Sequence, residues 1–157
     1  MSRKLMIAVA TCAAVFGGAV KADPLLASDP QTFIDFFAAE GVAAELKVDA
    51  AGDPLIEFRH GNEKKLMFFY DCIDNAECLA VQFYAGFKLD GPVSLEKLNE
   101  WNSGERRFTR AYGMDDNVAR IEMDIATILD GISARDFRDL LRLWLDRQAE
   151  FAAFISG

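Results

Sequence analysis

Two cysteines have the spacing of a small disulfide loop. Cys72 and Cys78 flank five residues between two runs of strand-like sequence. In an oxidising compartment such a pair forms a disulfide, and closing so short a loop contributes about 2 kcal/mol on the chain-entropy model. A redox or zinc site has less support, because there is no Cys-x-x-Cys motif and His60 is the only histidine. We therefore expect a structural disulfide.

Basic residues concentrate in one stretch, where an anion could bind. They are Arg106, Arg107, Arg110 and Arg120. Acidic residues lie close to them in the sequence, at Glu100, Glu105 and Glu122. Because acids outnumber bases, we expect ordinary ion pairs here. The alternative is an enzyme whose site lies around Arg110 and the nearby carboxylates, and a concave pocket joining Arg110, a carboxylate and His60 would favour it.

The other polar clusters match no catalytic or metal-binding pattern. One histidine does not support a Ser-His-Asp arrangement. An acidic loop lacks the glycine and the terminal bidentate glutamate of an EF-hand; it contains Asp71, Asp74, Asn75 and Glu77. We therefore predict no catalytic, cofactor-binding or metal-binding residue, and no cofactor.

The first 22 residues have the layout of a secretory signal peptide. Arg3 and Lys4 precede an apolar run over residues 5–20, and Val20-Lys21-Ala22 suits a cleavage site. The apolar run is shorter than the ~20 residues that a spanning helix needs. We therefore expect cleavage after Ala22, a periplasmic or secreted location, and a single domain over residues 23–157.

The charge of the exported part argues against a nucleic-acid partner. Cleavage after Ala22 removes three of the 17 basic residues and none of the 25 acidic ones, which leaves a net charge of −11. A surface this acidic repels a phosphate backbone. Disorder is excluded by the 52% content of hydrophobic residues. We expect no nucleic-acid partner, and no membrane association once the signal peptide is removed.

An α+β fold must position these residues. Helix signals follow the Asp29-Pro30 cap up to Gly41, and recur over residues 94–103 and 134–155. Strand signals cover residues 42–48, 55–60, 64–72, 78–89, 108–112 and 118–125. Since hairpin-length connections join neighbouring strands, we expect an antiparallel sheet of about six strands in the order α-β-β-β-β-α-β-β-α. The helices should pack mainly on one face.

Two helices carry apolar residues at the spacing of a buried stripe. In the helix over residues 94–103 these are Leu95, Leu98 and Trp101. In the last helix, Phe137 and Trp144 belong to the face that should close the core over the sheet.

The expected disulfide also predicts the register of two strands. If Cys72 pairs directly with Cys78, then Met67 lies opposite Phe83. A two-residue turn at Gly61-Asn62 would place Ile56 opposite Met67. One face of the sheet, the expected core, then collects Met67, Phe69, Leu79, Val81 and Phe83.

The second face has an apolar centre with charges around it, the pattern of an interaction site. The residues at this candidate partner surface are Leu66, Phe68, Tyr70 and Tyr84. The alternative is that the helix over residues 94–103 crosses over and buries these rings. The sequence leaves both arrangements open.

Two segments carry a resemblance to a known family. They read VSLEKLNEWN over residues 93–102 and RFTRAY over residues 107–112. The chain resembles the YbjN-like family, described as bacterial sensory transduction regulators. The resemblance implies a fold like that of type III secretion chaperones, and it carries no catalytic or ligand residues. We expect an exported, non-enzymatic binding or regulatory module that acts on a protein or peptide partner, or on a second copy of itself as a homodimer.

Overall fold

The computed structural model describes residues 23–157, so the predicted signal peptide lies outside the described residues. Three α-helices are α1 (Gln31–Ala39), α2 (Leu95–Ser103) and α3 (Ala134–Ser156). Six strands are β1 (Ala44–Val48), β2 (Pro54–His60), β3 (Glu63–Tyr70), β4 (Ala80–Lys88), β5 (Arg110–Met114) and β6 (Val118–Ala126), with a 3-10 turn at Asp115–Asn117. The predicted fold class and element order are confirmed.

All six strands form one antiparallel sheet in the order β1-β2-β3-β4-β6-β5. The turn at Gly61 joins β2 to β3, and a positive φ of 58° there suits glycine, which has no Cβ. Ile56 lies opposite Met67, and Met67 lies opposite Phe83, as the sequence predicted. Alternation along these strands sends the large apolar side chains to one face.

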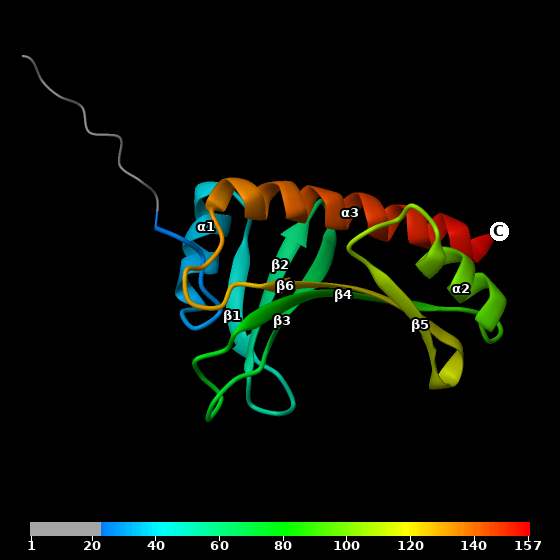
Figure 1. Cartoon of the computed structure of the whole chain (residues 1–157), viewed down its shortest axis with the longest axis horizontal. Coiled ribbons are helices and arrows are strands. Elements are labelled where there is room, and N and C mark those ends of the chain that lie inside the picture. Colours follow the sequence, from blue (N-terminus) through cyan, green and yellow to red (C-terminus); the bar gives the residue numbers. More distant parts are fainter. Residues whose placement is uncertain (1–22) are drawn as a thin grey trace, which may run out of the picture.

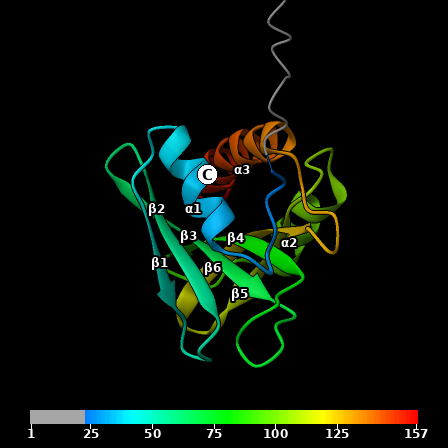
Figure 2. The same cartoon turned by 90° about the vertical axis from the view of Figure 1, so that its left-hand side faces the viewer.

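The three helices lie on one side of the sheet, and Figures 1 and 2 show α3 running along that side with α1 and α2 near its two ends. Buried rings fill the space between them: Phe33, Phe37, Phe58, Phe69, Phe83, Trp101, Phe137, Trp144 and Phe151. Trp101 of α2 packs on Phe151 of α3, with ring centroids 4.9 Å apart. The helix α2 therefore does not cross to the second face. The alternative prediction, in which this helix buries the aromatic rings of the candidate partner surface, is wrong.

The cysteines meet between β3 and β4. A disulfide joins Cys72 to Cys78, whose Cα atoms lie 3.8 Å apart. The bond closes the turn that follows Tyr70 and holds the ends of two central strands together. It is consistent with an oxidising compartment.

Replacing Cys72 and Cys78 together by alanine is expected to lower the free energy of unfolding by about 2 kcal/mol, because the unfolded chain regains the entropy of the open loop. Urea melts of the two proteins measure the difference. Intact-mass analysis of the exported, non-reduced wild type after thiol labelling gives the control, and it should find no labelled cysteine. Two labelled thiols would contradict the disulfide.

Two apolar residues lie outside the core that the sequence predicted. Leu79 is 44% exposed, because β4 begins only at Ala80 and the disulfide loop breaks the alternation before it. Leu95 is exposed at the first turn of α2, while Leu98 and Trp101 face α3 and β5. The strand predicted from residue 108 begins at Arg110 instead.

Within residues 23–157, no helix is long and apolar enough to cross a membrane.

Candidate functional site

The face of the sheet opposite the helices, which we call the open face, carries the candidate partner surface. Leu66, Phe68 and Tyr84 are half-buried there, and Tyr70 is exposed. The rings of Phe68 and Tyr84 pack edge to face with centroids 5.8 Å apart. Among residues 23–157, no helix covers these side chains, so they form an apolar centre that water reaches.

A buried carboxylate, that of Glu122, lies beside this centre on β6. Only 3% of Glu122 is exposed, although its strand position points it away from the core. Register explains the burial: Glu122 lies between Tyr84 of β4 and Arg110 of β5. An ionised carboxylate at such a position needs charged or hydrogen-bonding partners, because its desolvation is costly.

Four side chains supply those partners: Gln82, Arg110, Tyr112 and Arg120. Arg110 Nε donates a 3.0 Å hydrogen bond to Glu122 Oε2, and Arg110 Nη2 lies 2.8 Å from the same oxygen. The Tyr112 hydroxyl donates to Glu122 Oε1. Gln82 Nε2 lies 3.3 Å from Glu122 Oε2 and donates a 2.7 Å bond to Asp124 Oδ1. We call this cluster the Glu122 network; its members are Gln82, Arg110, Tyr112, Arg120, Glu122 and Asp124.

Arg120 connects the Glu122 network to the apolar centre. Its Nη1 donates a 3.0 Å hydrogen bond to the Tyr112 hydroxyl and lies 3.5 Å from Glu122 Oε1. Its guanidinium lies over the Tyr84 ring, 4.4 Å from the centroid. Cation–π contacts of this kind stabilise a partly desolvated arginine. The aromatic rings and the charges therefore form one connected surface.

The network also affects Tyr112 itself. Burial raises the pKa of the Tyr112 phenol, and the hydrogen bond to the Glu122 carboxylate raises it further. The phenol thus stays protonated and remains a donor to Glu122 at neutral pH. Of the four arginines expected to form ion pairs, Arg110 and Arg120 pair with Glu122. Arg106 instead lies over the Trp101 ring, and no ion pair of Arg107 forms within residues 23–157.

The structure does not bring His60 to this cluster. His60 lies at the end of β2, whereas Arg110 lies on β5, and β3, β4 and β6 separate the two strands. Within the described part of the chain, no group of three or more histidine, cysteine, aspartate or glutamate residues could hold a metal ion. The charges of the Glu122 network are engaged with each other, so the arrangement is suited to holding a surface in shape.

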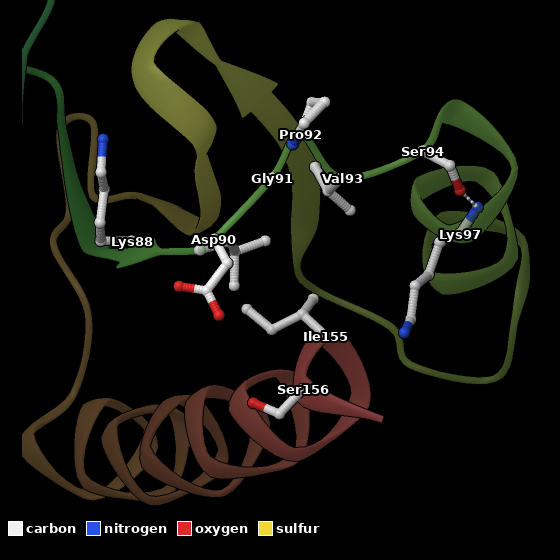
Figure 3. Close-up of a pocket in the computed structure, with 10 residues that line it drawn as sticks. Lys88, Asp90, Gly91, Pro92, Val93, Ser94, Lys97, Ile155 and Ser156 are labelled. Atoms are coloured by element: carbon white, nitrogen blue, oxygen red, sulfur yellow. Dashed lines mark hydrogen bonds between the residues drawn. The ribbon is translucent and has the colours of Figure 1, made fainter.

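A pocket of about 510 Å³ opens elsewhere, between the β4–α2 connection and the end of α3. Figure 3 shows Lys88 and Lys97 at its border, with Asp90 and Ile155 between them. The Lys88 amine donates to the carbonyl of Asp116, and the Lys97 amine lies 5.5 Å from the Phe154 ring centroid. Both lysines therefore have other contacts, and none of the predicted site residues lines this pocket.

Sequence reasoning expected Arg110, Arg120 and Glu122 to form ion pairs, but it missed that Gln82 and Tyr112 join them. One signal was present: Glu122 stands between the apolar residues Ile121 and Met123 and shares its side of the strand with Arg120 and Asp124. Finding its partners needed the pairing of β6 with β4 and β5.

One comparison with known proteins gives a match. A family model named YbjN, described as a putative bacterial sensory transduction regulator, matches residues 29–156. No curated protein and no solved structure matches the chain. The family match covers every helix and strand of the sheet described above. The chain therefore belongs to the YbjN family.

Proposed function

We propose that this protein is an exported, non-enzymatic binding or regulatory module, and that its open face contacts a protein or peptide partner. The observation that carries the proposal is the apolar centre of Leu66, Phe68, Tyr70 and Tyr84, which no helix of residues 23–157 covers. Antiparallel sheets often leave one face to water, but that face is normally polar.

The composition of the surface supports a protein partner. Interface centres are rich in tyrosine, phenylalanine and arginine, and a charged rim surrounds them. On the open face the rim consists of Lys47, Glu57 and Lys64 on one side and the Glu122 network on the other. Because Arg120 and the cross-strand pairs hold the rings in place, binding would cost little ordering of side chains.

Three further observations support export and a regulatory role. The disulfide suits an oxidising compartment, and the sequence of residues 1–22 has the layout of a signal peptide. The family description names sensory transduction. A partner in the periplasm or outside the cell fits all three.

The test compares the wild type with the variant Phe68→Glu, each used to capture partners from periplasmic extract. We expect this variant to keep a melting temperature near that of the wild type, because Phe68 is only half-buried. Capture of the partner should fall by about tenfold or more, since a charge in an apolar interface centre removes a central contact. The captured protein is then purified, and calorimetry measures its affinity for the wild type and for the Phe68→Glu variant.

Leu129→Glu is the matched control, because Leu129 is 86% exposed and lies outside the sheet. It introduces the same charge and should leave partner capture unchanged. Unfolding of Phe68→Glu would show that the open face is core. A folded Phe68→Glu variant that binds as well as the wild type would mean that partners bind elsewhere.

A further inference from the structure

Within residues 23–157, the strand β1 forms one edge of the sheet and pairs only with β2. Its sequence is Ala-Glu-Leu-Lys-Val, and its two large apolar residues are poorly covered: Leu46 is 47% exposed and Val48 is 70% exposed. A free edge with exposed apolar side chains is a template for pairing with another strand.

The hydrogen-bond pattern shows which backbone groups of β1 are free. Arg59 N donates to Ala43 O at 3.0 Å, and Asp49 N donates to Asp53 O at 2.9 Å. Hydrogen-bonded pairs alternate along an antiparallel ladder, so Glu45 and Lys47 also bond to β2. The N–H and C=O groups of the alternate residues, Ala44, Leu46 and Val48, therefore point outward from the edge.

The sequence of β1 is self-complementary in an antiparallel pair of two copies centred on Leu46. If two copies pair antiparallel with Leu46 opposite Leu46 of the partner subunit, Glu45 lies opposite Lys47 of the partner subunit, and the reverse pair follows by symmetry. The outward backbone groups of Ala44, Leu46 and Val48 then meet each other in register. Glu45 and Lys47 fall at the non-hydrogen-bonded positions, where opposite side chains come closest.

Neighbouring registers oppose like charges. A shift toward one end of the strand places Glu45 opposite its own copy, and a shift toward the other end places Lys47 opposite its own copy. Like charges directly across a ladder are destabilising. The same strand sequence thus both provides a pairing edge and selects one register for it.

We propose that β1 pairs with β1 of a second copy of this chain, in the register centred on Leu46. The two sheets then form one continuous sheet, in which Leu46 packs against its copy on the helix side and the two Glu45–Lys47 pairs form on the other side. The two-fold axis runs perpendicular to the sheet, so both open faces point the same way. This inference does not depend on the proposed function of the open face.

The first test uses charge reversal and sedimentation velocity over a range of protein concentrations. Wild type should show a monomer–dimer equilibrium. Glu45→Lys alone and Lys47→Glu alone should each weaken dimerisation by about tenfold or more, because two attractive cross-strand pairs become repulsive. An equimolar mixture of the two variants should form a heterodimer, since each chain then supplies the charge that the other lacks. Failure of the mixture to associate would overturn the register.

The second test blocks the hydrogen bonds of the edge. Leu46→Pro removes an N–H that points outward, so the ladder with β2 stays intact and the monomer should fold with its dimerisation lost. Glu45→Pro is the matched control, because it removes an N–H that bonds to β2 and should reduce the melting temperature instead. A wild type that stays monomeric at its highest soluble concentration, or a Leu46→Pro variant that still dimerises, would overturn the proposal.

Discussion

Replacing Trp144 by alanine is expected to lower the free energy of unfolding by about 3–5 kcal/mol, the range for removing a buried aromatic ring. Trp144 lies in the middle of α3 and has no exposed surface. Its ring stacks on Phe83 of β4, with centroids 5.8 Å apart. Phe83 in turn packs against Phe58 and Phe137, so the loss of Trp144 opens a cavity where α3 meets the sheet.

The matched control is Trp144→Phe, which keeps a ring above Phe83. It also removes the indole N–H, whose nitrogen is buried and finds no hydrogen-bond partner among residues 23–157. We expect this variant to lose less stability than Trp144→Ala, because phenylalanine leaves a smaller cavity. Urea melts of the wild type and both variants give the comparison. A loss below about 1 kcal/mol for Trp144→Ala would place this residue outside the core, because surface substitutions have effects of that size.

The register of β2, β3 and β4 could be predicted from sequence because local features determine it. The turn at Gly61 aligns β2 with β3, and direct pairing of the two cysteines aligns β3 with β4. The observed pairs Ile56–Met67 and Met67–Phe83 follow from these two constraints. A slip of one residue would move every apolar side chain to the opposite face, so the hydrophobic pattern supports the same register.

The place of β6 in the sheet has no such local signal. The chain leaves β4 through α2 and β5 before β6 inserts between β4 and β5. No turn of the chain encodes the β4–β6 pairing, so the position of Gln82 opposite Asp124 could not be derived. Alternation along β6 sends Glu122 away from the core, since Ile121 and Met123 on either side of it are buried. It could not predict that neighbouring strands would bury Glu122, since burial there depends on side chains from β4 and β5.

Leu79 and Leu95 show where periodicity alone fails. Both continue the apolar pattern of an element past the point where that element has a packing partner. Leu79 precedes the first paired residue of β4, and Leu95 occupies the first turn of α2, ahead of the turns that reach α3. A repeat in the sequence gives the direction of a side chain, but its burial also requires a neighbour on that side.

Replacing Glu122 by alanine is expected to lower the free energy of unfolding by about 2 kcal/mol, because the buried carboxylate is the charged hydrogen-bond acceptor of the half-buried Tyr112 and lies beside the half-buried Arg120, although Arg110 reaches water. The Tyr112 hydroxyl and Arg110 Nε lose their acceptor. Arg120 loses its nearby carboxylate, and its Nε is already buried without a hydrogen-bond partner among residues 23–157. Thermal and urea melts measure the change.

Glu57→Ala is the matched control on the same face. Glu57 also contacts two cations, with Lys47 Nζ at 3.0 Å and Lys64 Nζ at 2.7 Å. Both lysines reach water, and exposed ion pairs contribute little, so the melting temperature should change only slightly. If the two alanine variants lost the same stability, burial of Glu122 would not be the cause of its effect.

A spectroscopic measurement separates the network from simple packing. In Glu122→Gln the side chain keeps its size but loses its charge, so the pKa of Tyr112 should fall toward its ordinary value. Ultraviolet titration of the phenols detects the shift, and adding Tyr112→Phe to the variant identifies which tyrosine moved. Burial still raises the Tyr112 pKa in the variant, so the fall should be partial. An unchanged titration would mean that Tyr112 donates to a group other than Glu122, and the connection between the apolar centre and the buried carboxylate would have to be abandoned.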